Sequence, residues 1–323
     1  MNDATGSIGV TGQSEPNDPA IETIGLSKRY GRTIALGGLT MRVPRGQVFG
    51  FLGPNGAGKT TAVKLLLGLA RPSGGSGRLL GAPLGDRPSR RRVGYLPELF
   101  RYQPWLTARD VLGLHADLVH IERAARAGAI DEALGIVSLT ERGGDRVGTF
   151  SKGMQQRLGL GVALLGRPEV VFLDEPTSAL DPIGRLDVRS IIHDLRDRGT
   201  TVFLNSHLLT EVERVCDEVA IVDRGRVVAA GSLDELLGAS TVRVRVTGLT
   251  EAGRARLADF GIATDDPPWI VVRGCPPEAV PDLVAALVSS GARVYEVDAG
   301  RESLEERFLA LLGHVPERTG TAS

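Results

Sequence analysis

Residues 48–66 read VFGFLGPNGAGKTTAVKLL, and this stretch decides the fold. Its apolar start, residues 48–52, predicts a buried parallel strand, and the apolar repeat that follows Thr61 predicts a helix. Between them, residues 53–60 match the pattern G-x-x-x-x-G-K-[ST] in the strand–loop–helix context that a phosphate-binding loop requires. A glycine-rich turn without a ligand is the alternative, and motifs later in the chain favour the phosphate loop. We therefore predict that the chain binds a nucleotide.

The residues of this loop are suited to hold phosphate groups. Glycine lacks a Cβ atom, so the backbone can curl with its N–H groups toward phosphate oxygens. The helix N-terminus adds free donors and partial positive charge. Lys59 is expected to reach the β- and γ-phosphates, and the Thr60 hydroxyl is expected to hold Mg²⁺. The residues expected to bind the nucleotide here are Gly53, Pro54, Asn55, Gly56, Ala57, Gly58, Lys59, Thr60 and Thr61.

Composition narrows the class of protein. Hydrophobic residues make up 42% and charged residues 24% of the 323-residue chain, as in ordinary globular proteins. The net charge of −1 gives no reason to expect nucleic acid as a partner. The sequence has no run of 18 apolar residues and no basic-then-apolar start, so we expect a cytoplasmic chain that needs a partner for any membrane role. The two cysteines, Cys216 and Cys275, match no metal or redox spacing, which indicates reduced thiols.

The pattern along the chain predicts two domains between polar ends. Residues 1–19 are polar with scattered glycine and proline, which predicts a disordered tail. Strand and helix patterns alternate over residues 20–237, which predicts a mostly parallel sheet, with a helical insertion at about residues 98–165. Residues 240–315 predict a small α+β domain, and residues 316–323 predict a loose tail. The fold class is therefore α/β with a second, smaller α+β domain.

Two acidic residues end a second apolar run. Residues 170–173 are continuously apolar, which is typical of a strand buried on both faces. Asp174 and Glu175 follow it, and this places both carboxylates at the edge of the sheet where phosphate loops also lie. Asp174 can reach Mg²⁺ through water, and Glu175 can orient and polarise an attacking water. An acidic turn after a strand would be the simpler interpretation if these residues stood alone.

Three further segments accompany them. They are FSKGMQQR at residues 150–157, SALD at residues 178–181 and NSH at residues 205–207. Their order, with the helical insertion before the Ser-x-Gly segment, resembles that of the ATPase subunits of ABC transporters. The resemblance covers residues 20–235 and implies a P-loop NTPase fold of the ABC ATPase type, with ATP and Mg²⁺ as ligands.

The resemblance also implies roles for individual residues. Tyr30 matches the aromatic residue that stacks on adenine, and His207 matches the switch histidine that senses the γ-phosphate. Ser151 and Gly153 match the signature motif, which meets the γ-phosphate held by the opposite subunit. Asp181 matches the acid of the loop that crosses the dimer interface. Two such chains are therefore expected to enclose ATP between them.

Two positions depart from the family pattern. The signature usually reads LSGGQ, and here Lys152 and Met154 replace the first glycine and the glutamine. The glutamine that usually contacts Mg²⁺ falls on Glu98, whose carboxylate can accept a hydrogen bond or bind metal but cannot donate. The residues expected at the metal are Thr60, Glu98 and Asp174, and those expected to act in catalysis are Glu175 and His207.

Both departures are similar to those of one subclass, the ATPases of multidrug, antibiotic, polysaccharide and other exporters. Residues 303–309, SLEERFL, also resemble the small domain appended in that subclass. The expected function is ATP hydrolysis that powers export through a separate integral membrane permease subunit. The chain is expected to act as a homodimer or a paralogous heterodimer on the inner face of the cell membrane.

Other functions within the superfamily remain as alternatives. An importer ATPase is the nearest. A soluble ABC ATPase without a transport role is the other alternative. A translation factor of this kind would carry two motif sets, and a DNA-repair ATPase would need long heptad arms; this sequence has neither.

The apolar cluster at residues 100–106, which includes Trp105, follows the Glu98 loop. The resemblance implies that this is where the membrane subunit inserts its coupling helix.

Overall fold

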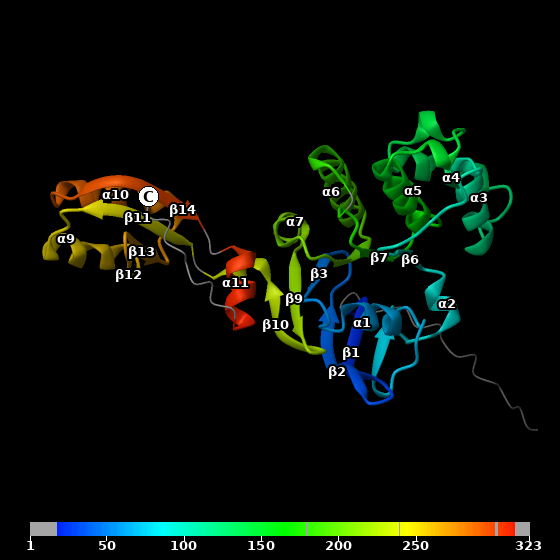
Figure 1. The fold of residues 1–323 in the computed structure, drawn as a ribbon, viewed down its shortest axis with the longest axis horizontal. Coiled ribbons are helices and arrows are strands. Elements are labelled where there is room, and N and C mark those ends of the chain that lie inside the picture. The colour runs from blue at the N-terminus through cyan, green and yellow to red at the C-terminus, as the bar shows by residue number, and fades with distance from the viewer. Residues whose placement is uncertain (1–17, 179, 239, 301–302, 314–323) are drawn as a thin grey trace, which may run out of the picture. The chain divides into compact units, whose positions relative to one another are not determined.

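The computed structural model describes residues 18–178, 180–238, 240–300 and 303–313. These residues form two compact units (Figure 1). One unit takes the described residues up to Leu208 together with Val215–Val228, and the other takes Leu209–Arg214 and the described residues from Ala229 onward. The tail predicted at residues 1–19 lies outside the described residues except for its last two, and the tail predicted at residues 316–323 lies outside them entirely.

The first unit begins with an antiparallel sheet of four strands in the order β2-β1-β4-β5. Its members are β1 (Ile21–Tyr30), β2 (Thr33–Val43), β4 (Gly74–Leu79) and β5 (Ala82–Pro83). β1 and β2 form a hairpin in which Tyr30 pairs with Thr33 next to the turn. The buried faces of β1, β2 and β4 pack in one hydrophobic core with β3 and α1. This hairpin therefore carries Tyr30 on an element that packs against the phosphate-loop strand and helix.

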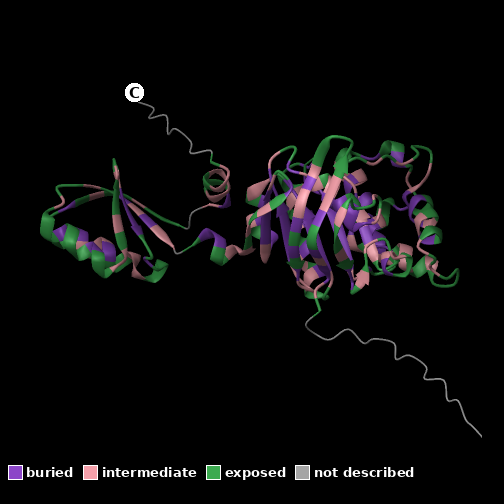
Figure 2. Ribbon diagram, turned by 90° about the horizontal axis from the view of Figure 1, so that it is seen from below, coloured by how far each residue is buried: buried purple, intermediate pink, exposed green. Residues whose placement is uncertain are grey.

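The second sheet of this unit has the order β10-β9-β3-β8-β7-β6. Its members are β3 (Val48–Leu52), β6 (Val93–Leu96), β7 (Val170–Asp174), β8 (Thr201–Asn205), β9 (Glu218–Asp223) and β10 (Arg226–Ser232). β6, β7, β8, β3 and β9 pair in parallel. Every residue of β3, β7 and β8 is buried. Figure 2 shows buried segments alternating with partly exposed ones across the strands of this unit. Because these strands are parallel, their carboxyl ends meet at one edge of the sheet.

Phe203 on β8 lies at the centre of this sheet's packing. Its ring centroid is 5.0 Å from that of Phe172, 5.2 Å from that of Phe51 and 5.9 Å from that of Phe49. Aromatic pairs at such separations add stability beyond the area they bury. The strands that end at the phosphate loop and at the two acids are thus joined by one aromatic cluster.

The helices of this unit include three that fall within residues 98–165, the range of the predicted helical insertion. In chain order, the α-helices of the unit are α1 (Lys59–Leu66), α2 (Arg87–Arg90), α3 (Ala108–Leu118), α4 (Arg126–Ile136), α5 (Lys152–Leu164) and α6 (Pro182–Asp197). α3 begins at a capping box in which Thr107 and Asp110 satisfy each other's backbone N–H groups. Within the described residues, no helix is both long enough and apolar enough to cross a membrane.

β6 and α5 approach each other closely at Gly94. A Cβ atom on Gly94 would lie 1.9 Å from the carbonyl oxygen of Ala163 and 2.8 Å from a methyl group of Val171. Gly94→Ala is therefore expected to lower the free energy of unfolding by about 3 kcal/mol or more, because the backbone of α5 must move. Gly128→Ala on α4 is the control. A Cβ there meets nothing within 4 Å, and the change should be neutral or stabilise by about 0.5–1 kcal/mol.

Denaturant unfolding of the two variants and the parent measures both effects. A Gly94→Ala protein as stable as the parent would contradict the close approach of β6 and α5.

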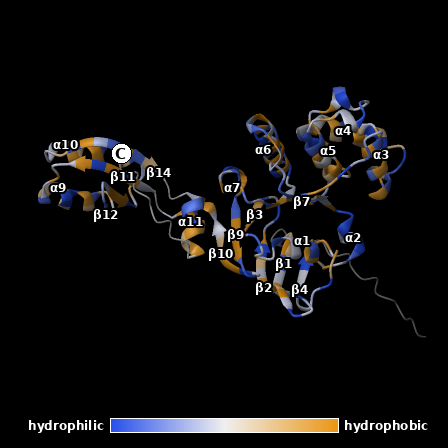
Figure 3. Ribbon diagram, viewed as in Figure 1, coloured by the Kyte–Doolittle hydropathy of each residue, from blue (hydrophilic) through white to orange (hydrophobic). Residues whose placement is uncertain are grey.

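The second unit is built on a four-stranded antiparallel sheet in the order β12-β13-β11-β14. Its strands are β11 (Thr241–Thr247), β12 (Ile262–Asp266), β13 (Trp269–Arg273) and β14 (Arg293–Gly300). Helices α9 (Glu251–Arg256) and α10 (Val280–Ser289) complete a β-α-β-β-α-β order, which is ferredoxin-like. α10 is rich in hydrophobic residues (Figure 3), and Leu283 and Leu287 join the core beneath the sheet.

Three more helices are α7 (Leu209–Val215), most of which belongs to the second unit, α8 (Leu233–Leu237) and α11 (Leu304–Leu311). Glu213 on α7 accepts a hydrogen bond from the backbone N–H of Leu304, at 3.2 Å. This contact ties the first turn of α11 to α7. The sequence patterns predict neither α7 nor β12.

Candidate functional site

The phosphate loop joins β3 to α1 and is held by neighbouring backbone. Gly58 is the N-cap of α1 with a φ of 98°, and no side chain among the described residues caps this helix. The first N–H groups of α1 are therefore available to a ligand. A Cβ atom on Gly58 would lie 2.4 Å from the carbonyl oxygen of Ala35, so only glycine fits there. From the other side, Gly225 N donates to Ala57 O at 2.8 Å, which fixes the curl of the loop.

Lys59 supplies the positive charge of the loop. Its Nζ donates to the carbonyl oxygen of Gly53 at 2.6 Å, so the side chain folds back over the loop. Burial lowers the pKa of Lys59, and the negative charges of Glu175, Asp174 and Glu98 raise it. Three predicted site carboxylates therefore lie within electrostatic reach of the predicted phosphate-binding cation.

Asp174 ends β7 as a buried carboxylate, 4% exposed. Asn205 pairs with it in the ladder between β7 and β8, and the Asn205 amide donates to Asp174 Oδ1 at 2.5 Å. Burial raises the pKa of Asp174, and so do Glu98 and Glu175, whereas the hydrogen bond from Asn205 and the charge of Lys59 lower it. Sequence reasoning did not assign Asn205 to the site. The available signal was its place as a polar residue at the end of a buried strand.

Glu175 and His207 are in direct contact. Glu175 has a φ of 54°, a left-handed conformation that non-glycine residues adopt at a cost and that clusters at functional sites. Its backbone N–H donates to Asn205 O at 2.8 Å, which helps to hold this conformation. His207 N donates to Glu175 Oε1 at 2.9 Å, and His207 Nδ1 lies 2.8 Å from Glu175 Oε2. The hydrogen bond thus orients Oε1, and the ring of His207 lies beside Oε2; the Glu175 side chain is 9% exposed and that of His207 is 59% exposed.

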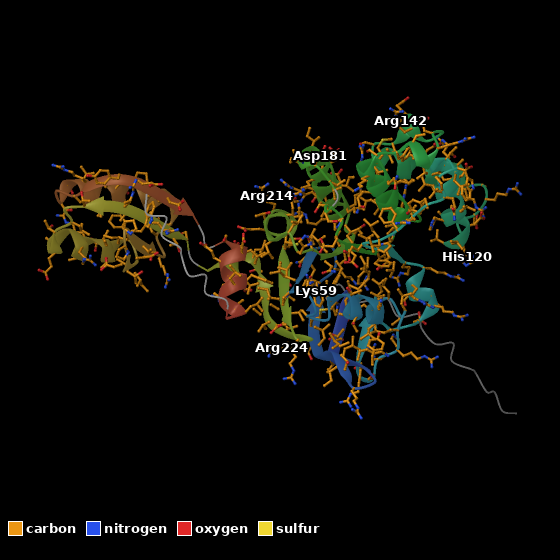
Figure 4. All side chains as sticks on the ribbon, viewed as in Figure 1. Lys59, His120, Arg142, Asp181, Arg214 and Arg224 are labelled. Atoms are coloured by element: carbon orange, nitrogen blue, oxygen red, sulfur yellow. The ribbon has the colours of Figure 1, made fainter. Side chains whose placement is uncertain are left out.

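A second group of predicted residues lies at the starts of two helices. Ser151 caps α5 by accepting from Met154 N at 3.2 Å, and Asp181 caps α6 by accepting from Gly184 N at 2.7 Å. Together with Gly153, they line one pocket of about 370 Å³. In the described part of the chain, no hydrogen bond or ion pair joins Ser151 or Asp181 to the group around the phosphate loop. Figure 4 shows Lys59 and Asp181 on separate elements, apart from each other.

Other predicted residues take exposed positions. Tyr30 is 50% exposed at the end of β1, with Lys28 Nζ 4.8 Å from its ring centroid. Thr60 is exposed on the first turn of α1, next to Lys59. Asn55 and Gly56 are exposed, and Gly53, Pro54, Ala57 and Thr61 are at least partly buried.

The oxygen ligands at the loop suit Mg²⁺. No cluster of three or more His, Cys, Asp or Glu side chains that could hold a metal by itself occurs among the described residues. Mg²⁺ is usually bound by one or two carboxylates together with substrate phosphates and water, and does not need such a cluster. Asp174, Glu98 and the Thr60 hydroxyl offer oxygen donors of the kind that it prefers. The donor set therefore fits this ion.

Known proteins resemble this chain over most of its length. Residues 36–178 match the ABC transporter family. The chain is 44% identical to an uncharacterised ABC transporter ATP-binding protein of Nostoc, over 86% of this chain and 83% of that protein. It is 35% identical to the daunorubicin/doxorubicin resistance ATP-binding protein DrrA of Streptomyces peucetius, over 94% of this chain and 95% of that protein. It is 41% identical to the bacitracin transport ATP-binding protein BcrA of Bacillus licheniformis, over 67% and 71%.

Solved structures agree in fold. The ATP-binding subunit of an ABC transporter, 32% identical, matches with a TM-score of 0.62 over 67% of this chain and 91% of that chain. A nucleotide-free ATP-binding cassette, 20% identical, has the same TM-score over 67% of this chain and 92% of that chain, which shows the fold alone. The predicted fold class is confirmed. This chain belongs to the ABC transporter family, as an ATP-binding subunit and an ATPase.

Proposed function

We propose that this chain hydrolyses Mg-ATP as a pair of subunits and thereby powers an exporter whose membrane-spanning part is a separate chain. The observation that carries the proposal is the meeting of Lys59, Asp174, Glu175 and His207 at one sheet edge, where the phosphate loop also lies. A cation, a buried acid and an acid oriented by a histidine are the groups that phosphoryl transfer to water requires.

Binding uses the loop and the first turn of α1. The Lys59 ammonium and the free N–H groups of α1 hold the β- and γ-phosphates, and Tyr30 stacks on adenine. Thr60, Asp174 and Glu98 would hold Mg²⁺, which when bound neutralises phosphate charge. Asn205 keeps the Asp174 carboxylate in one orientation through its 2.5 Å hydrogen bond. The Asp174 carboxylate is thus held in place before the nucleotide arrives.

Hydrolysis depends on Glu175. Its carboxylate accepts a proton from the attacking water, and its orientation is set by the backbone N–H and ring of His207. The left-handed backbone of Glu175 aims the side chain away from the direction that an extended strand would give it. Glu175 and His207 are in contact, so a movement of His207 when the γ-phosphate binds or leaves would also move the carboxylate that acts as base.

The separation of the two groups of site residues supports a two-subunit arrangement. Ser151, Gly153 and Asp181 line a pocket at the N-terminus of α5, a helix of 13 residues whose dipole attracts an anion. No residue of the phosphate loop of the same chain lines this pocket. The γ-phosphate that Lys59 of a second chain holds would therefore be the ligand that fills it. One chain holds both the phosphate-loop group and the Ser151 group, so a homodimer is the simplest arrangement. A paralogous heterodimer would also bring the two groups together.

The export role is supported by the relatives' names and by an exposed apolar surface. Two relatives are named for resistance to daunorubicin/doxorubicin and for bacitracin transport. Four apolar side chains that follow the Glu98 loop or lie on α3 are exposed: Leu99 by 87%, Trp105 by 66%, Leu114 by 54% and Leu118 by 71%. Large apolar side chains that are exposed in one region of a subunit are typical of interaction sites, and this supports the proposal. The proposed occupant is a helix of the membrane-spanning partner, which would place this chain on the inner face of the cell membrane, with no nucleic acid involved.

This surface is connected by packing to α5, the helix that begins after Ser151 of the signature motif. A Cβ atom on Gly159 of α5 would lie 2.7 Å from the ring of Phe100, so Phe100 packs directly on the α5 backbone. Tyr102 extends the contact, because its ring centroid is 5.4 Å from that of Phe100. A displacement at the partner surface would therefore reach the helix that begins at Ser151.

Trp105→Ala is expected to uncouple transport from ATP hydrolysis, because Trp105 is a large exposed anchor and such residues dominate interfaces. Daunorubicin serves as the transport probe because one relative is named for resistance to it. In inverted membrane vesicles that contain the chain and its membrane partner, daunorubicin uptake should fall by about tenfold or more, while basal ATPase activity of the isolated chain is unchanged. Ile262→Ala, which removes a similarly exposed apolar side chain on the second unit, is the control.

Normal uptake by the Trp105→Ala vesicles would place the partner surface elsewhere. ATP-driven loss of the drug from the inverted vesicles would contradict export.

Tyr30→Ala is expected to weaken Mg-ATP binding by about 1–2 kcal/mol, the range of a lost stacking contact. The ring is half exposed at the end of β1 and can offer a face to the base. Calorimetric titration of the variant and the parent measures the change. Equal affinities would show that Tyr30 is an ordinary surface residue and would leave the phosphate loop unaffected.

A further inference from the structure

Lys28 occupies an unusual position beside Tyr30. Its Nζ atom lies 4.8 Å from the centroid of the Tyr30 ring, within the range of a cation–π interaction. The same ammonium donates to the carbonyl oxygen of Arg71 at 2.7 Å. Lys28 and Tyr30 are two residues apart on β1, so their side chains project from the same face of the strand. The ammonium is thus held between a backbone carbonyl and the ring.

Arg71 lies in the turn that follows the phosphate-loop helix. Two further hydrogen bonds join this turn to β1: Ser73 N donates to Ser27 O at 2.8 Å, and Arg29 N donates to the Ser73 hydroxyl at 3.1 Å. The end of β1 is therefore fastened to the segment after α1. Because α1 begins at the phosphate loop, these bonds hold the end of β1, which carries Tyr30, near the segment that leads from the phosphate loop.

The charge on one face of the ring affects what the other face can bind. A cation over one face of the ring attracts the π electrons and lowers the negative potential of the opposite face. That opposite face stays open to a ligand, and it then stacks more favourably with an electron-rich aromatic system. Adenine is such a system. A bare tyrosine would be freer to rotate and would offer both faces.

We propose that Lys28 is a positioning residue for the nucleotide base: it clamps the Tyr30 ring from one side and leaves the other side for adenine. This inference rests on the proposed stacking of Tyr30 on adenine. It assigns to Lys28 a role in affinity for the base and none in affinity for the phosphates.

The test compares two ligands that differ only in the base and sugar, Mg-ATP and Mg-tripolyphosphate. Lys28→Met keeps the length of the side chain and removes the charge, and it should weaken Mg-ATP binding by about twofold to fivefold, the range of an exposed cation–π contact. Binding of Mg-tripolyphosphate should be unchanged. Lys28→Arg keeps the cation and the donor and should restore most of the ATP affinity. Lys64→Met, which removes the exposed lysine of α1, is the matched control.

A double-mutant cycle with Tyr30→Ala shows whether Lys28 acts through the ring. In the Tyr30→Ala background, Lys28→Met should cause no further loss of ATP affinity, because the ring that it positions is gone. Equal losses in both backgrounds would overturn the proposal, and so would an unchanged affinity of the single variant for Mg-ATP. An equal loss for Mg-ATP and Mg-tripolyphosphate would also overturn it, because Lys28 would then act on the phosphate loop.

The same measurements separate this inference from the one on which it rests. If Tyr30→Ala binds Mg-ATP as tightly as the parent, the adenine subsite is elsewhere and the role of Lys28 fails with it. If Tyr30→Ala weakens binding and Lys28→Met does not, only the role of Lys28 fails.

Discussion

Lys59→Ala is expected to abolish tight binding of Mg-ATP. Lys59 carries the charge of the phosphate loop and folds over it, with its ammonium 2.6 Å from Gly53 O. Two charge-assisted contacts to phosphate at about 1.5–3 kcal/mol each correspond to a loss of at least about 100-fold. The effect is enlarged by the surroundings, because Glu175, Asp174 and Glu98 all act on Lys59 electrostatically. Without the ammonium, these carboxylates would repel the phosphates.

Isothermal titration of the purified protein with Mg-ATP measures this loss. Lys64→Ala, which removes another α1 lysine away from the loop, should bind as the parent does. Circular dichroism of the two variants shows whether both are folded. Tight, Mg²⁺-dependent binding retained by Lys59→Ala would contradict the assignment of the phosphate loop.

Glu175→Gln is expected to stop turnover while leaving nucleotide binding intact. The amide has the size of the carboxylate and keeps one oxygen that can accept from His207 N, but it cannot take a proton from water. General-base help is typically worth about 10²–10⁴-fold, so the rate of ATP hydrolysis should fall by at least about two orders of magnitude. Lys59, Thr60 and Asp174 remain to hold Mg-ATP, so its dissociation constant should stay within about threefold.

Phosphate release and Mg-ATP titration measure these two quantities on one protein sample. Glu141→Gln, a change of the same kind on the exposed surface, is the control and should hydrolyse ATP normally. A Glu175→Gln rate within tenfold of the parent would remove Glu175 from the chemical step.

Local patterns were sufficient for much of the central sheet. The runs at residues 48–52 and 170–173 predict buried strands, and β3 and β7 are buried throughout. Their shared edge follows from parallel pairing, so the sequence could place the phosphate loop and the two acids together. The capping box at Thr107 and Asp110 agrees with the T-x-x-D pattern of residues 107–110, since both of its contacts lie within one turn of chain.

Other elements depend on pairing between distant strands. The sequence predicts one mostly parallel sheet, whereas β1, β2, β4 and β5 form a separate antiparallel sheet. β12, with only Ile262 and Ala263 apolar, owes its conformation to its ladder with β13. Its first residue is 73% exposed, and its sequence has no alternation of apolar and polar residues that would predict a strand. α7 begins two residues after His207, and the sequence pattern of this region indicates the His207 motif without predicting a helix.

The site shows the same division between local and distant information. Motifs identify Asp174, Glu175 and His207 one at a time, but the contact of Glu175 with His207 spans 32 positions in the chain. Asn205 was missed because its bond to Asp174 depends on the register of β7 against β8. The division of the site residues into a phosphate-loop group and a Ser151 group is likewise visible only in the structure.

The most direct test of the two-subunit mechanism is the size of Glu175→Gln in solution with Mg-ATP and with Mg-ADP. With hydrolysis blocked, the γ-phosphate should bridge Lys59 of one chain and Ser151 of the other, so light scattering after gel filtration should give a dimer in Mg-ATP and a monomer in Mg-ADP. Adding Ser151→Arg, which places bulk and charge at this junction, should return the Mg-ATP sample to a monomer. A monomer of Glu175→Gln in both nucleotides, or a dimer that survives Ser151→Arg, would contradict the mechanism.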